Sequence, residues 1–177
     1  MSNITSLESL IDIFEDLDAS EQIKALKKID IPLNEFKKFA TWRAGDYTRN
    51  CIVRRDGFEF ILLCWDHEST TPIHGHANQD CWVYQVSGEI TETRFKEEST
   101  GFTVTNQSTI SQGEITYMHD RMGYHKIENT SGKRAMTLHV YANPIDKCKV
   151  FNEELSKFEV KELAYDSVGE VVMAEVG

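Results

Sequence analysis

Residues 48–66 read TRNCIVRR-DG-FEFILLCWD and contain the strongest fold signal in the chain. Two runs rich in β-branched and aromatic residues flank Asp56-Gly57, a dipeptide typical of a two-residue β-hairpin turn. Similar runs follow, with Gly88-Glu89 predicted as another hairpin turn: CWVYQVS (81–87), ITETRF (90–95), FTVTNQ (102–107), EITYMH (114–119), GYHKIEN (123–129) and AMTLHVY (135–141). Many short strands separated by turn signals predict an all-β sandwich or barrel. Residues 151–177 are expected to add one or two edge strands.

The first 43 residues have a helical pattern instead. Apolar residues recur at helical spacing in three short stretches, 7–14, 23–29 and 33–39. Thr5 with Glu8, and Asp18 with Glu21, match the pattern of a capping box, and Pro32 suits the first turn of a helix. We expect a structural helical layer that packs on the β region and contributes no chemistry.

Composition excludes several classes of partner. The 177 residues fit one domain, and the 40% hydrophobic and 27% charged fractions are those of an ordinary globular protein. The formal net charge is −10 and no dense cluster of Lys or Arg occurs. Nucleic acid and anionic membrane surfaces are therefore not expected as main partners. A small anionic substrate would need a local positive site.

We expect neither an export signal nor a membrane-spanning segment in this sequence. Its N-terminus is too acidic and interrupted for a signal peptide, and no apolar run approaches the roughly 20 residues of a transmembrane helix. We therefore expect a cytoplasmic protein with free thiols. None of its four cysteines forms a CxxC pair, which argues against a zinc ribbon or a thioredoxin motif.

His74-Gly75-His76 is the first candidate metal-binding motif. Residues two apart on a strand point to the same side, so both imidazoles can bind one ion, although such a pair also occurs by chance on surfaces. His125, in GYHKIEN, is a third candidate that only a folded β-barrel could bring to the pair. This framing resembles the two conserved sequence blocks of cupins. The resemblance implies a mainly β fold with a small, jelly-roll-like cupin barrel. The barrel would span residues 44–177 and the helical layer residues 1–43, and the two would form a single cupin domain.

Cys81 stands where the cupin pattern usually has a glutamate ligand. Three neutral histidines leave a divalent iron with its charge uncompensated, whereas the common non-haem iron(II) pattern is two histidines and one carboxylate. The missing carboxylate makes room for an anionic substrate ligand, for which a thiolate is a good candidate.

Two polar groups on strands are candidates for substrate contacts. Tyr47 and Arg49 share a strand face, and a guanidinium can bind a carboxylate in a bidentate fashion, although an arginine on a strand is usually a surface residue. Thr137, His139 and Tyr141 also share one face. They would form a hydroxyl–imidazole–phenol chain if that face is buried, or an ordinary polar surface if it is exposed.

Together these motifs resemble the cysteine dioxygenase family. The resemblance covers roughly residues 47–151 and rests on YTRN (47–50), Trp65, HGH (74–76) with Cys81, GYHKIEN and TLHVY (137–141) followed by Cys148. It implies that three histidines bind one Fe(II) ion: His74, His76 and His125. It also implies that Arg49 binds the cysteine carboxylate, with Tyr47 nearby.

The same resemblance assigns the remaining site residues. Thr137, His139 and Tyr141 match the family's Ser-x-His-x-Tyr relay, with threonine in place of serine. Cys81 and Tyr141 match the residues that form a thioether cofactor in animal-type members. We expect Trp65 to pack behind this pair. His67, His119 and Cys148 are given no catalytic role, and the sequence leaves open whether the bond before Pro72 is cis.

The implied reaction is the oxidation of L-cysteine by O2 to L-cysteine sulfinic acid, with the substrate thiolate and amine on the iron. The resemblance also implies cysteine catabolism leading to taurine biosynthesis, and a monomer. One alternative is a dioxygenase for another small thiol, such as 3-mercaptopropionate, although those relatives typically have Gln at the position of Arg49. A second is a cupin that binds metal without catalysis, and a weaker third is a metal-dependent isomerase.

Overall fold

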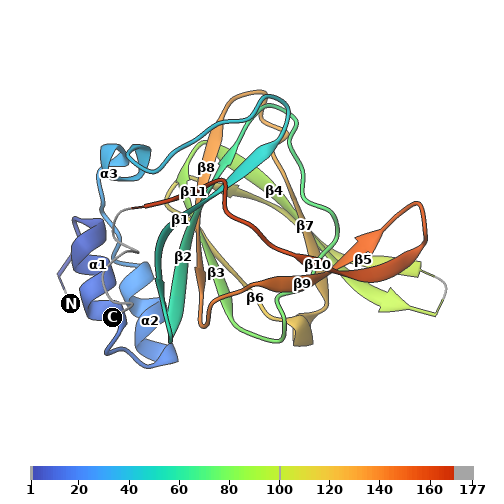
Figure 1. Cartoon of the computed structure of the whole chain (residues 1–177), viewed down its shortest axis with the longest axis horizontal. Helices are drawn as coiled ribbons and strands as arrows, with labels where there is room; N and C mark the ends of the chain where they lie inside the picture. The colour runs from blue at the N-terminus through green and yellow to red at the C-terminus, as the bar shows by residue number, and fades with distance from the viewer. Residues whose placement is uncertain (1, 100, 170–177) are drawn as a thin grey trace.

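The computed structural model describes residues 2–99 and 101–169. It contains an N-terminal helical layer and two β layers (Figure 1). The helices lie at one end of the molecule and the longest hairpins extend toward the other. Among the described residues, no helix has the length and apolar character needed to cross a membrane.

Three short helices form the helical layer: α1 (Leu7–Phe14), α2 (Ala19–Leu26) and α3 (Leu33–Lys37). The predicted capping box at the start of α2 is confirmed, since the side chains of Asp18 and Glu21 each accept a hydrogen bond from the other's backbone amide. The predicted cap of α1 at Thr5 is wrong by one residue. Ser6 accepts from the Ser9 amide at 3.1 Å instead, because the helix begins at Leu7. Leu7 is buried together with Leu10, Ile11 and Phe14.

The larger sheet has the strand order β11-β1-β2-β8-β3-β6. Its strands are β1 (Tyr47–Arg55), β2 (Phe58–Trp65), β3 (Cys81–Ser87), β6 (Ile115–Met118), β8 (Ala135–Tyr141) and β11 (Ser167–Val168). The hairpin predicted at Asp56-Gly57 is confirmed, since β1 and β2 pair antiparallel on either side of it. Near the end of the described chain, β11 pairs parallel with β1. Residues 170–177, where the expected tail strands could also fall, lie outside the described residues.

The second layer combines a three-stranded sheet, ordered β5-β4-β7, with the hairpin β10-β9. Its strands are β4 (Glu89–Glu98), β5 (Gly101–Ser111), β7 (Tyr124–Glu128), β9 (Lys147–Asn152) and β10 (Lys157–Glu162). The segment around His74 connects the three-stranded sheet to the β10-β9 hairpin. His74 and His125 exchange backbone hydrogen bonds of 2.9 and 3.1 Å, and His74 also bridges to Val150. A candidate ligand is thus part of the ladder itself.

The turn predicted at Gly88-Glu89 is not a hairpin. β3 pairs with β6 and β8, whereas β4 pairs with β5 and β7, so the chain crosses here from one layer to the other. Gly88 has φ +71°, and a Cβ atom there would lie 3.0 Å from the Cβ of Ala135. Glycine permits this crossing because it tolerates positive φ and needs no space for a side chain.

Alternation along β2 and β8 separates two cores. One core lies against the helices and contains Phe14, Phe36, Phe60, Leu62, Leu138 and Val140, and the other lies between the β layers and contains Ile61, Leu63, Trp65, Val83, Ile127 and Tyr141. The predicted mainly β, jelly-roll-like cupin fold with an N-terminal helical layer is confirmed. Its strands form two facing layers rather than one closed ladder in the described residues.

Candidate metal centre

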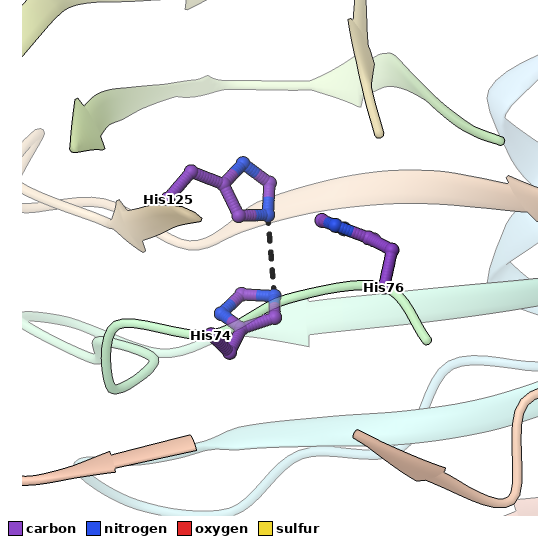
Figure 2. Close-up of side chains that lie close together, drawn as sticks. All are labelled: His74, His76 and His125. Atoms are coloured by element: carbon purple, nitrogen blue, oxygen red, sulfur yellow. Dashed lines mark hydrogen bonds between the residues drawn. The ribbon is translucent and has the colours of Figure 1, made fainter. Parts of the chain in front are cut away.

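Three imidazoles converge between the β layers. His74 and His76 both lie on the connection between β2 and β3, where His74 bridges to β7 on one side and to β9 on the other, and His125 lies on β7. One ring nitrogen of each lies within 4.8 Å of the others, and the Nε2 atoms of His74 and His125 are 3.2 Å apart (Figure 2). Bonds of about 2.1 Å, as in zinc–histidine sites, at angles of about 90–110° place ligand nitrogens roughly 3.0–3.4 Å apart. The spacing of His74 and His125 therefore fits ligation of one metal ion.

The other contacts of the rings favour the same interpretation. His74 Nδ1 lies 3.0 Å from the carbonyl oxygen of Pro72, so it donates there and leaves Nε2 free to bind a metal. Both ring nitrogens of His76 are buried without a hydrogen-bond partner among the described residues. Buried polar atoms without partners are uncommon in proteins, and a metal ion would supply the missing partner.

His125 is supported by a carboxylate that the sequence analysis missed. Its Nδ1 lies 2.7 Å from Oε1 of Glu92, and both side chains are almost fully buried. The other oxygen of Glu92 accepts hydrogen bonds from Arg94 at 3.0 and 3.1 Å and from Thr116 at 2.8 Å. Such a carboxylate fixes the tautomer and orientation of a metal-binding histidine. A glutamate on the same strand face as the buried Ile90 was the signal that could have identified it.

The surroundings of all three imidazoles favour the neutral form of the ring. Desolvation lowers the pKa of His74, and it lowers the pKa values of His76 and His125 well below the usual range. The neighbouring imidazoles add to the effect for His76 and His125, because a second positive charge so close is unfavourable. A neutral imidazole is the form that binds a metal.

A cavity opens beside His74, and its described lining contains Arg49 and Tyr47. The Nε and Nη2 atoms of Arg49 are buried without a hydrogen-bond partner among the described residues. Arginine is always charged and can only donate hydrogen bonds, so these atoms favour an anionic ligand in the cavity. The interpretation of Arg49 as an ordinary surface residue does not fit this position.

The polar face of β8 is buried. Thr137, His139 and Tyr141 are at most 4% exposed, which excludes the alternative of an exposed polar surface. Trp65 Nε1 donates to the Thr137 hydroxyl at 2.8 Å, and that hydroxyl lies 3.0 Å from Nε2 of His139. Burial lowers the pKa of His139 to about 3, with Arg49 adding to the effect.

The expected chain through Tyr141 is incomplete. No hydrogen bond joins His139 to Tyr141 within the described chain, where their ring centroids are 6.3 Å apart, and Nδ1 of His139 has no partner. Both side chains line the cavity instead. His139 therefore lines the space in which a ligand would bind and has one ring nitrogen without a partner.

Cys81 and Tyr141 lie directly opposite each other on the neighbouring strands β3 and β8. Both side chains are buried, and this burial raises the pKa of the Cys81 thiol and raises that of the Tyr141 phenol well above its usual range. The neighbouring Tyr141 side chain opposes the shift of the Cys81 pKa. Cross-strand neighbours have Cβ atoms about 4.5–5.5 Å apart, which suits a covalent link between these side chains.

Trp65 differs from its expected position behind this pair. It lies opposite Ala135, which is six residues from Tyr141 along β8. Because each residue of a strand advances the chain by about 3.3 Å, Trp65 is far from the Cys81–Tyr141 pair along the strand direction. Its ring packs on Tyr47, with centroids 5.1 Å apart. Trp65 thus supports the Thr137 end of β8.

The remaining residues that the sequence raised are also located. His119 caps a short 3-10 helix by accepting from the Arg121 amide at 3.1 Å, and His67 is exposed. Cys148 is buried and lines the cavity. No cis peptide bond occurs in the described ranges, so the bond before Pro72 is trans.

Fold and site together define a cupin-type protein with a three-histidine metal centre. The model of the family described as "Cysteine dioxygenase type I" matches residues 2–154. Because this match covers most of the chain, the chain belongs to that family and is a dioxygenase. The three-histidine site in this family supports, more specifically, a thiol dioxygenase.

Individual relatives agree with the family match. Cysteine dioxygenase type 1 of Danio rerio is 27% identical over 160 residues, which cover 84% of this chain and 80% of the relative. The human protein of the same name is 26% identical over 159 residues, with the same coverage.

Solved structures support the fold alone. A Klebsiella pneumoniae protein with a double-stranded β-helix domain is 12% identical, has a TM-score of 0.52, and is matched over 72% of this chain and 94% of its own. A Thermus thermophilus protein is 19% identical with a TM-score of 0.50, over 61% of this chain and 93% of its own.

Proposed function

We propose that this enzyme oxidises L-cysteine with O2 to L-cysteine sulfinic acid at an iron(II) ion held by His74, His76 and His125. The observation that carries the proposal is that Arg49, which has unpartnered buried donors, lines the same cavity as His74. Such a cavity suits a small molecule with a metal-binding group at one end and a carboxylate at the other. The names of the relatives provide the substrate.

Bound iron(II) would supply the redox chemistry and a binding site for the thiolate. Arg49 would pair with the substrate carboxylate and orient the sulfur toward the metal. Tyr141 would donate a hydrogen bond from its phenol, and a thioether to Cys81 would restrict this side chain. Apolar side chains in the cavity wall, such as Leu63, Ile145 and Leu163, would exclude water from the reacting sulfur. Both atoms of O2 would be transferred to sulfur, so no other oxidant is required.

Oxidation of 3-mercaptopropionate is the second candidate, and one observation favours it. The described cavity lining contains no Asp or Glu that could bind a substrate ammonium group. The protein side chains thus recognise a carboxylate but no amine, and a preference for cysteine would depend on binding of its amine to the metal. A monomeric state and a cytoplasmic location stay predictions.

Oxygen uptake and sulfinate formation by the iron-loaded enzyme test the proposal. We expect the highest kcat/KM with L-cysteine, a lower value with 3-mercaptopropionate, and the lowest with cysteamine, which lacks the carboxylate. A higher value for 3-mercaptopropionate would establish the second candidate. A protein that retains iron but consumes no O2 with any of these thiols would be a non-catalytic metal-binding cupin.

A further inference from the structure

We infer that Asp120 is a positioning residue that holds the metal ligand His76 in place through the backbone. Asp120 begins the short 3-10 helix between β6 and β7 (Asp120–Met122). Its Oδ1 accepts a hydrogen bond from the His76 amide at 2.5 Å, and its Oδ2 accepts from the Asn78 amide at 2.8 Å. The inference rests on the proposed metal site, but it concerns a residue outside the ligand set.

His76 depends on this support more than the other two ligands. The imidazoles of His74 and His125 are oriented by Pro72 and Glu92, whereas the imidazole of His76 has no hydrogen-bond partner among the described residues. Nδ1 of His76 is 4.0 Å from Asp120, too far for a hydrogen bond. Its direction is therefore set by the backbone that carries it, which comes from a loop rather than a paired strand.

That loop has an unfavourable conformation of its own. Ala77 and Asn78 have φ of 53° and 61°, a region that residues other than glycine rarely adopt. A carboxylate that accepts from the amides of His76 and Asn78, one before and one after Ala77, stabilises this conformation. Asp120 supplies the carboxylate from a different part of the chain, so the loop of His76 is tied to the start of β7, where His125 lies.

Close packing around Gly75 gives a second way to disturb the same contact. A Cβ atom at Gly75 would lie 2.9 Å from Oδ1 of Asp120, the atom that receives the His76 amide. Gly75→Ala would therefore push the carboxylate away without altering Asp120 itself. The glycine between the two histidines permits their spacing and also the approach of the carboxylate.

Titration of the metal-free full-length protein with Co(II), followed by absorption and calorimetry, tests the inference. We expect graded losses of affinity. Asp120→Asn, which keeps one acceptor oxygen, should be weakened by about 10-fold, and Asp120→Ala by up to about 100-fold, the range found for partners of metal ligands. Gly75→Ala should fall between wild type and Asp120→Ala. The Co(II) absorption bands should shift in each, because the position of one ligand changes.

Asp30→Asn serves as the matched control, since Asp30 contacts Asn3 in the helical region. It should bind Co(II) as tightly as wild type. Affinities within twofold of wild type in both Asp120→Asn and Gly75→Ala would overturn the inference. If Asp120→Ala does not fold, these two milder variants decide. The titration does not measure substrate oxidation. A result that overturns the inference on Asp120 would therefore leave the proposed function unaffected.

Discussion

The imidazoles of His74, His76 and His125 lie close together, and a different interaction positions each of them. A backbone carbonyl orients His74, a buried carboxylate orients His125, and the loop backbone places His76. Arg49 adds a charge whose donors are not satisfied within the described chain. At the scale of single residues, the site thus places a set of metal-binding imidazoles beside the unpartnered guanidinium of Arg49.

Arg49→Gln tests the role of that cation. Loss of a charge-assisted bond of about 1.5–3 kcal/mol should lower kcat/KM for L-cysteine by roughly 10- to 150-fold, mainly through KM. Steady-state oxygen uptake measures it. The control Arg55→Gln removes an arginine that pairs with Glu15, and it should leave the kinetics unchanged. An unaltered kcat/KM in Arg49→Gln would remove this residue from substrate binding.

Glu92→Gln tests the carboxylate behind His125. The change leaves the guanidinium of Arg94 without its anionic partner in a largely buried site, which should cost about 3–5 kcal/mol of unfolding free energy and weaken Fe(II) binding by about 10- to 100-fold. Denaturant unfolding and metal titration measure the two effects. Glu128→Gln, in a more exposed ion pair with Lys126 on β7, should cost less than about 1 kcal/mol. Equal effects in both variants would contradict the role of Glu92.

At the scale of elements, strand register brings the candidate cofactor residues together. Cys81 and Tyr141 are separated by 60 positions in the sequence, yet the pairing of β3 with β8 places them opposite each other. Alternation on β8 turns Thr137, His139 and Tyr141 toward the cavity side and leaves Leu138 and Val140 for the helical core.

This register predicts a thioether between Cys81 and Tyr141 after turnover with iron and cysteine. The intact mass should fall by the mass of two hydrogen atoms, and Cys81→Ala should abolish the change. Cys64→Ala is the control, because Cys64 is buried in the helical core on the opposite face of the sheet, and it should retain the loss. The same loss in Cys81→Ala would show that another pair reacts.

The element patterns show where sequence reasoning succeeds. Asp56-Gly57 predicts its hairpin because the turn is local, and three histidines with the spacing of HGH and GYHKIEN are identified by resemblance before any contact is known. Gly88 is misread because a glycine with positive φ serves a crossing between layers as well as a hairpin, and only long-range pairing distinguishes them. Glu92 and Asp120 are missed because their partners lie 33 and 44 residues away.

At the scale of the whole molecule, polar contacts connect the end of the helical layer to the larger sheet. Asp66, at the end of β2, accepts from the Gly45 amide and from Arg134, each at 3.0 Å. The guanidinium of Arg134 in turn lies over the ring of Trp42, 4.5 Å from its centroid. These contacts connect the end of the helical layer to the strands that carry the site.

Asp66→Asn should therefore change how stability depends on pH. The hydrogen bond from Gly45, followed by Arg134, lowers the pKa of Asp66 below its ordinary value of 3.8. A lowered pKa contributes stability above the unfolded value, and this contribution is lost as the pH falls through the folded value. In the metal-free protein, the difference in Tm between wild type and Asp66→Asn should be largest near neutral pH and shrink below about pH 4.

The exposed Asp12→Asn in α1 is the control for that series, and its Tm should follow wild type at every pH. A difference between wild type and Asp66→Asn that stays constant or grows in acid would contradict the assigned pKa shift.

The fate of isotopically heavy O2 is the most direct test of the central claim, that three imidazoles hold an iron ion which transfers oxygen to the sulfur of cysteine. The iron-loaded enzyme should form L-cysteine sulfinic acid with both sulfinate oxygens heavy and with O2 and cysteine consumed in equal amounts. His125→Ala should form none. Sulfinate oxygen derived from water, or undiminished product from His125→Ala, would contradict the account.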